Sequence, residues 1–345
     1  MYFRRGRWTP VLGLILRRLV QLPIILAVIY TLTLTLAWRI PGNPLENPEG
    51  RRPAPEVVAA MKAQYRLDSF SSFYWSYLDN ASGIKFLRDT LSGRAAEQAR
   101  AAEAAGLAPP DRLVFDLGPS LQYRDRRVNE IVSSALPVSI TLGAAAIAIA
   151  LVIGLAAGVA GAIKPNSLTD LLTLSIALIG ISLPSFVIGA ALLLLFPVLL
   201  GWGRIPSWGR PVDLLLPAFT LSLPFAAYIA RLTRLGMIEQ LQSDYIRTAR
   251  AKGVSESAVL LKHALKNAFL PVLSYLGPAA AFAMTGSFVV ERVFVIPGMG
   301  QHFVNAVQNK DLFLIIGVVL IFATMLVLFN LLVDVLYRWA DPRIE

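Results

Sequence analysis

A polar stretch between two long apolar segments holds the residues of this chain whose types and spacing best indicate a function. It runs from Asp244 to Pro271, and its chemistry is recognition through charges, hydrogen bonds and a helix face. The residues on both sides of Gly253 favour helix, and a glycine lets the chain turn at low steric cost. Ser243 is of the type that caps the first of these helices. We expect a helix, a sharp turn and a second helix at the membrane surface, where a body outside the bilayer can push on them.

The second helix of this stretch has an apolar face. Its apolar positions recur at helical spacing, and they are Val254, Ala258, Leu261 and Leu265. The charged positions face elsewhere, and they are Glu256, Lys262 and Lys266. The residues alone leave two interpretations open. The stretch is either an amphipathic hairpin held on anionic lipid or a helix that docks in the groove of a partner.

The chain lacks the patterns of common catalytic and metal chemistry. It has no cysteine, which excludes disulfides, thiolate metal sites and iron–sulfur clusters. No GxxxxGK followed by Ser or Thr is present, so the sequence offers no P-loop for a nucleotide phosphate. The two histidines, His263 and His302, are far apart in sequence, and no Ser, His and acidic residues have the spacing of a nucleophile with its base. We expect no metal site and no enzymatic activity in this chain.

The elements that must position the polar stretch are membrane helices. The chain is 56% hydrophobic and 16% charged, whereas soluble domains have about a quarter charged residues. About 20 apolar residues cross a bilayer as a helix. Six stretches without a charged residue are long enough: Leu19–Trp38, Ile131–Ile163, Leu171–Gly203, Leu214–Ala230, Asn267–Val290 and Leu312–Val333. We therefore predict an all-α membrane protein with six transmembrane helices.

The positive charges indicate the orientation of these helices. Basic residues concentrate on the cytoplasmic side of membrane proteins, and five arginines precede the first span: Arg4, Arg5, Arg7, Arg17 and Arg18. The same assignment makes the polar stretch and the C-terminus cytoplasmic, so the net charge of +10 needs no nucleic acid as a partner. We expect a cytoplasmic N-terminus at 1–18, a first span at 19–38, kept as an uncleaved anchor, and one large external loop at 39–130. A five-helix core would follow at 131–345, with the cytoplasmic loop at about 231–267.

The external loop is polar but contains helical patterns. PEVVAAMKAQYRL, which begins at Pro55, is typical of a helix. The Ala-rich stretch from Gly93 predicts another helix, stopped by Gly106 and Pro109.

The polar stretch resembles the "EAA" loop of ABC importer permease subunits, in which a short coupling helix docks on the ATPase. DYIRTARAKG and HALKNAFLP are similar to the peptide and nickel branch of these permeases. The general signature has Glu where this chain has Arg247, so an ionic contact at that position does not carry over. The matching positions are Asp244, Tyr245, Arg247, Thr248, Ala249, Arg250, Ala251, Lys252, Gly253, His263, Ala264, Leu265, Asn267, Ala268 and Pro271.

Other segments match the same branch in the same order. They are Arg17–Arg18 with IPGNP, FDLGPS, LPSFVIG, GSFVVERVFVIPGMG and the C-terminal NLLVDVLYRWADPRIE. Asn43 stands where Asp is usual and Phe115 where Gly is usual. Only the region 70–113 lacks a counterpart. We expect it to be a solvated insertion rather than a contact for an external partner, because surface loops lengthen at low cost.

The resemblance implies a type I ABC importer permease fold in the cytoplasmic (inner) membrane. The implied partners are a second homologous permease, two ATP-binding subunits that bind ATP and Mg, an external solute-binding protein and membrane lipid. The cargo would be a peptide or a related small solute such as nickel or glutathione. A membrane pore or scaffold subunit and an ion-coupled carrier stay open as alternatives. The absence of charged residues within the spans is unfavourable to a carrier.

The resemblance also assigns roles to residues. The ATPase-coupling contacts are expected at Asp244, Tyr245, Arg247, Ala249, Lys252, Gly253 and Val254. The translocation pathway is expected near Pro184, Ser185, Pro224 and Glu291. The two prolines are equally consistent with simple kinks in membrane helices and with kinked helices that line a cavity and move. An interfacial anchor or salt bridge is the other interpretation of Glu291.

Overall fold

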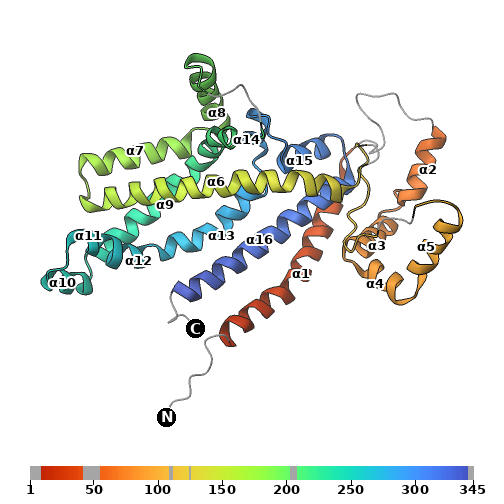
Figure 1. The fold of residues 1–345 in the computed structure, drawn as a ribbon, viewed down its shortest axis with the longest axis horizontal. Helices are drawn as coiled ribbons and strands as arrows, with labels where there is room; N and C mark the ends of the chain where they lie inside the picture. The colour runs from red at the N-terminus through yellow and green to blue at the C-terminus, as the bar shows by residue number, and fades with distance from the viewer. Residues whose placement is uncertain (1–8, 42–54, 109–111, 124–125, 203–207, 341–345) are drawn as a thin grey trace, which may run out of the picture. The chain divides into compact units, whose positions relative to one another are not determined.

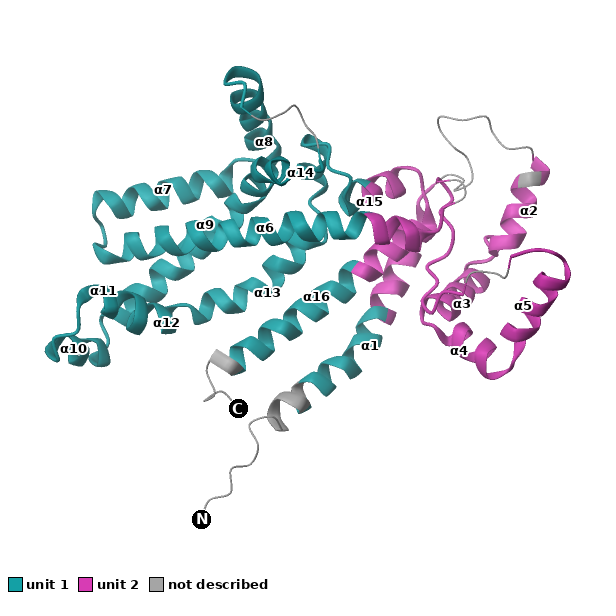
Figure 2. Cartoon of the chain, viewed as in Figure 1, with its two compact units in different colours: residues 1–26, 135–301, 322–345 teal, residues 27–134, 302–321 magenta. Residues whose placement is uncertain are grey.

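The computed structural model describes residues 9–41, 55–108, 112–123, 126–202 and 208–340. Within these ranges the chain is built of helices, and the β-structure is one isolated bridge between Pro119 and Arg127 (Figure 1). The chain divides into two compact units, which Figure 2 shows in two colours. They are Met1–Leu26, Ala135–Gln301 and Phe322–Glu345 for unit 1, and Ala27–Ser134 and His302–Ile321 for unit 2.

Five helical segments are long and apolar enough to cross a membrane. They are Ile15–Arg39, Val128–Ile163, Pro211–Leu241, Leu270–Val293 and Leu312–Arg338. They contain or overlap five of the six expected spans. The helices themselves are α1 (Thr9–Arg39), α6 (Val128–Ile163), η2 (Pro211–Leu214) with α9 (Leu215–Leu241), α13 (Leu270–Met284) with α14 (Phe288–Val293), and α16 (Leu312–Ala340).

The expected span Leu171–Gly203 is not one straight helix. It forms α7 (Leu168–Ser182) and α8 (Ser185–Leu193), which continues as the π-helix η1 (Leu194–Leu199), and the two parts are bent by 100°. The break lies at Leu183, whose ψ of 130° is extended, because a residue before proline is disfavoured in the α region. Pro184 then occupies the N-cap of α8. Counting this bent pair as one span brings the number of spans in the described residues to six.

The core of unit 1 lies among α6, α8, α9, α13 and α14. Its fully buried side chains include Leu142, Ile229 and Ile296. Gly154 and Gly158 of α6 lie directly against α9, where an added Cβ would collide with Ile229 and Thr233. Since small residues let helix backbones approach closely in membranes, these glycines permit the contact between α6 and α9.

Unit 2 combines parts of membrane helices with the helices of the external loop. These are α2 (Pro55–Tyr65), α3 (Phe70–Ala81), α4 (Ile84–Leu91) and α5 (Arg94–Ala104). The two helices expected from the sequence are present as α2 and α5, and Gly106 follows α5 with a φ of +68°. The sequence did not predict α3 and α4. Helix α15 (Met299–Gln308) links the two units along the chain.

Candidate functional site

The polar stretch folds as a helical hairpin that we call the coupling hairpin. It consists of α10 (Asp244–Ala251), α11 (Glu256–Ala258), the π-helix η3 (Val259–Ala264) and α12 (Leu265–Ala268). The hairpin follows α9 directly and has its own core in unit 1. The buried residues of this core are Ala162, Met237, Ile246, Val259, Ala264 and Ala268. The hairpin is therefore fixed to the ends of α6 and α9 by apolar packing.

The π-helix changes which side chains of the second arm face inward. Val259 and Ala264, five residues apart, are both buried, whereas Leu261 is 62% exposed. The sequence pattern assumed regular α-helical spacing and placed Leu261 on the apolar face, which is wrong. A turn with i→i+5 bonds inserts an extra residue, so the buried face resumes one position later.

Tyr245 holds the two arms of the hairpin together. Its hydroxyl donates to Gln240 Oε1 at 2.8 Å and lies 3.4 Å from the carbonyl oxygen of His263. The same hydroxyl accepts a hydrogen bond from Asn267 Nδ2 at 3.1 Å. Its ring remains partly open to solvent, at 40% exposure. Tyr245 can thus join α9, α10 and η3–α12 while remaining partly exposed.

Replacing Tyr245 with phenylalanine is expected to loosen α10 without unfolding unit 1. The variant loses the hydroxyl contacts, and Gln240 and Asn267 then bond to water, so the net cost is at most about 1 kcal/mol. Hydrogen exchange of the α10 amides should accelerate by up to about fivefold, while the amides of α5 serve as the internal control. Unchanged α10 exchange would show that the hydroxyl does not hold the arms together.

The turn at Gly253 is as sharp as the sequence predicts. Gly253 has a φ of +75°, and a Cβ added there would meet nothing within 4 Å. Across the turn, Arg250 Nη2 and Glu256 Oε1 form an ion pair at 2.6 Å. The hydrogen bond from Arg250 lowers the pKa of the Glu256 carboxyl. Both side chains are exposed, so this ion pair contributes little to stability.

The structure separates the seven expected coupling residues into two groups. Ala249 and Val254 pack against the core of the hairpin and hold the turn in place. The other five are exposed: Asp244, Tyr245, Arg247, Lys252 and Gly253. Arg247 is paired with Asp244 of its own helix at 3.3 Å. Ser243 is at the N-cap of α10, but its hydroxyl donates to the carbonyl oxygen of Gln240 instead of capping the helix.

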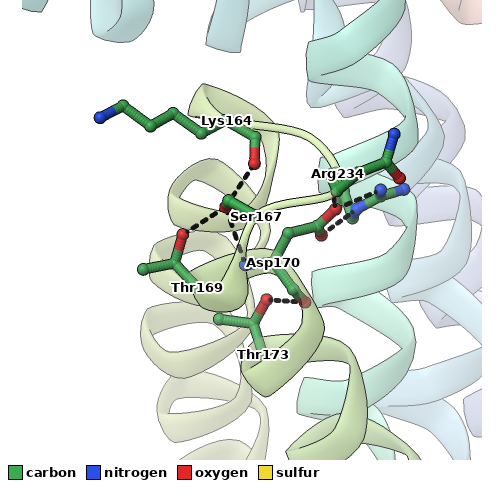
Figure 3. A network of polar contacts seen from close by, with 7 residues as sticks. Lys164, Ser167, Thr169, Asp170, Thr173 and Arg234 are labelled. Atoms are coloured by element: carbon green, nitrogen blue, oxygen red, sulfur yellow. Dashed lines mark hydrogen bonds and ion pairs between the residues drawn. The ribbon is translucent and has the colours of Figure 1, made fainter.

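An ion pair between α7 and α9, the helix that precedes the coupling hairpin, was not predicted from the sequence. Arg234 of α9 binds Asp170 of α7 through two bonds, Nε to Oδ1 at 2.5 Å and Nη2 to Oδ2 at 2.6 Å (Figure 3). The Asp170 side chain is 2% exposed and that of Arg234 is 17% exposed. The backbone N–H of Asn166 donates to the same carboxylate at 2.8 Å, and the hydroxyl of Ser167 caps α7. The structure thus places a charge pair joined by two hydrogen bonds in the part of α9 that leads into the hairpin.

This ion pair had a weak signal in the sequence. Arg234 is one of several basic residues in the loop expected at about 231–267, and Asp170 lies just before the uncharged stretch Leu171–Gly203. An acidic residue at the end of one span and a basic residue at the end of another are candidates for pairing, because isolated charges are costly there.

The four expected pathway residues lie on or next to three helices that contact one another: Pro184 is the N-cap of α8, and the other three are on α8, α9 and α14. Pro184 is exposed at the start of α8, whereas Ser185 and Pro224 are half-buried. Glu291 is fully buried.

The Glu291 carboxylate is enclosed by hydrogen bonds. It accepts from Ser139 Oγ and from the backbone N–H of Gly300, both at 2.8 Å. Ser139 Oγ also accepts from the backbone N–H of Met299 at 2.9 Å. The carboxylate therefore fastens the loop after α14 to α6.

Among the described residues, no three His, Asp or Glu side chains gather as a metal site would require.

Comparison with known proteins identifies the family. Residues 150–345 match the family model described as "Binding-protein-dependent transport system inner membrane component". The match covers more than half of the chain. The chain belongs to this family. It is a membrane component of a transport system, not an enzyme, and its fold is the type I ABC importer permease fold predicted from the motifs.

Full-length relatives agree with this family assignment. The chain is 38% identical to the oligopeptide transport system permease protein OppB of Haemophilus influenzae, over 97% of this chain and 99% of the relative. It is 36% identical to the dipeptide transport system permease protein DppB of Bacillus subtilis, over 92% and 93%. Among solved structures, a chain in a crystal structure of an amino acid ABC transporter with histidines matches with a TM-score of 0.47 and 19% identity. That alignment covers 61% of this chain and 94% of the other. The predicted class, a permease subunit of a peptide-type ABC importer, is confirmed.

Proposed function

We propose that this permease subunit imports peptides by alternating access, in a complex driven by ATP hydrolysis on separate subunits. The complex would contain a second homologous permease, two ATP-binding subunits that hold ATP and Mg, and an external solute-binding protein. The proposal of a peptide cargo rests on the near-complete coverage of relatives named for oligopeptide and dipeptide transport. Nickel and glutathione are the competing cargoes for the test below.

The coupling role is supported by the structure of the coupling hairpin, which combines a packed core with an exposed charged surface. A packed core holds α10 and the Gly253 turn rigidly, while Asp244, Arg247 and Lys252 stay exposed on the outside. A rigid element with a charged, exposed surface suits docking in a partner's groove. A lipid-bound amphipathic hairpin would instead present its apolar residues outward, and here most of those residues face the hairpin's own core.

A cytoplasmic location of both termini is part of the proposal. Arg18, near the start of α1, pairs with Asp334, near the end of α16, at 2.7 Å. This ion pair supports a topology in which the two ends lie on one side of the membrane. The basic residues around the hairpin support the cytoplasm as that side.

In the proposed mechanism, closure of the ATP-binding subunits displaces the coupling hairpin. Since the hairpin continues from α9 and shares a core with α6, the displacement would pass to these helices. Rigid-body rotation of packed helices is a known form of such switching. The pathway would open and close near the contacts of α8, α9 and α14, where Pro184, Ser185 and Pro224 lie.

The test is ligand-stimulated ATP hydrolysis by the reconstituted complex. The complex is purified with its solute-binding protein, placed in nanodiscs and supplied with dipeptides, longer peptides, Ni²⁺ or glutathione in separate reactions. A peptide should raise the hydrolysis rate, and only when the binding protein is present. Stimulation by Ni²⁺ or glutathione alone would refute the peptide assignment. Purified protein that carries no ATPase and supports uptake driven by an ion gradient would refute the importer itself.

A further inference from the structure

Helix α3 of the external loop lies alongside the C-terminal part of α1. The ring of Trp38 contacts Phe73 at 5.7 Å between centroids. About two helical turns earlier in α1, the ring of Tyr30 stacks on the ring of Tyr77, with 5.6 Å between centroids. The Tyr30 hydroxyl donates to the carbonyl oxygen of Tyr74 at 2.7 Å. Tyr30 is 1% exposed and Leu34 is 0% exposed, so α3 covers this face of α1.

These contacts set the level of α3 relative to the bilayer. The span of α1 ends at Arg39, and Tyr30 lies 39 − 30 = 9 residues before it, or about 13 Å along the helix at about 1.5 Å per residue. Half of a hydrocarbon core of about 30 Å is about 15 Å. The span of α16 begins at Leu312, and its next residue, Phe313, contacts Phe73 and Tyr77 at 5.2 and 5.8 Å. Helix α3 therefore packs against the C-terminal part of α1 and the start of α16, within the depth of one leaflet.

Large apolar side chains on α3 and α4 are exposed in the described part of the chain. Trp75 of α3 is 67% exposed. On α4, Ile84, Leu87 and Leu91 are spaced as i, i+3 and i+7, which places them on one helix face, and each is more than half exposed. Lys85 lies toward the other side of this short helix.

We propose that α3 and α4 form an interfacial element that lies in the bilayer leaflet at the C-terminal end of α1. Trp75 and the α4 face of Ile84, Leu87 and Leu91 contact lipid acyl chains there, and Lys85 lies at the headgroups. In the orientation proposed above this is the outer leaflet. The sequence favoured a solvated insertion for 70–113. The proposal limits that description to the part after α4, where α5 is rich in Ala, Glu and Arg.

Two observations favour lipid over a docked protein as the occupant. First, α1 itself exposes Val28, Leu32 and Leu36 beside the covered face, so a surface of the span that faces the membrane continues next to α3. Second, aromatic side chains concentrate at the membrane–water boundary, and an amphipathic helix with basic residues beside an apolar face is typical of interfacial binding.

The chain has no cysteine, so single labels can be placed without altering it otherwise. Leu87→Cys and Leu91→Cys, each carrying a nitroxide, are measured in the full complex in nanodiscs, with the other subunits cysteine-free. Lys85→Cys on the same helix and Glu97→Cys on α5 are the matched controls. Collisions with oxygen, which concentrates in lipid, are compared with collisions with a water-soluble nickel chelate.

The two leucine positions should collide more often with oxygen than with the nickel chelate, and Glu97→Cys should show the reverse. Lys85→Cys should fall between them. Frequent nickel collisions at Leu87 and Leu91 would mean a solvated helix and would overturn the proposal. Few collisions with either reagent would mean a protein cover, either the second permease or the binding protein, and would also overturn it. The measurement needs no cargo or ATP, so its result is independent of the proposed transport activity.

Discussion

Replacing Arg234 with methionine is expected to destabilise unit 1 markedly, as removing one partner from a buried ion pair usually does. The loss arises because Asp170, 2% exposed, keeps its charge without a counter-charge. The purified protein should unfold at a markedly lower temperature or denaturant concentration. Arg231→Met is the control, because Arg231 is an exposed arginine on the same helix.

A second substitution separates the ion pair from simple packing. Asn at position 170 can still accept from the N–H of Asn166 but carries no charge. The double variant Asp170→Asn with Arg234→Met should therefore regain much of the stability lost in Arg234→Met. If Arg234→Met were no less stable than Arg231→Met, or if the double variant were no better than the single one, the pair would not hold α7 to α9.

Gly253→Pro is expected to abolish coupled peptide uptake while the protein stays in the membrane. Proline fixes φ near −65°, whereas the turn requires +75°, so α10 would change its direction relative to the second arm. Even about 1.4 kcal/mol of lost docking energy weakens an interface by about tenfold. In proteoliposomes, uptake should fall by about tenfold or more, and the ligand should no longer stimulate ATP hydrolysis.

A matched glycine serves as the control for this substitution. Gly106 follows α5 in unit 2, has a φ of +68° and has open space around its Cα. Gly106→Pro imposes the same backbone conflict outside the coupling hairpin and should leave uptake near that of the unchanged protein. Normal uptake by Gly253→Pro, or equal losses in both variants, would contradict the coupling role of the turn.

Local signals in the sequence predicted much of the fold. Apolar runs located five spans, and helix-forming residues located α2, α5 and α10. Gly253 marked its turn because positive φ is a property of the residue itself. The 100° bend could not be predicted, since Pro184 breaks a helix but the direction that follows depends on the packing of α8 against α9 and α14.

The candidate site was predictable only in part. The π-helix changes the helical register of the second arm, and the ion-paired residues are far apart in the sequence. The extra residue in η3 moved Leu261 out of the apolar face, because a π-helix depends on tertiary packing that a periodic pattern does not contain. Ala249 and Val254, which were expected at a partner surface, also pack against the hairpin's core, and nothing in the sequence indicated this second contact. Asp170 and Arg234 are 64 positions apart in the chain, and no local pattern reports such a contact.

Gly154 and Gly158 affect how a movement of the coupling hairpin is transmitted along α6 and α9. Because they bring the backbone of α6 against α9, the joint between the two helices contains few long side chains that could change rotamer and absorb a displacement. Such a joint is stiff along its length, and the two helices should tilt together as a single lever. A displacement of the coupling hairpin at one end of α6 and α9 would then produce a displacement of similar size at their far ends, several helical turns away.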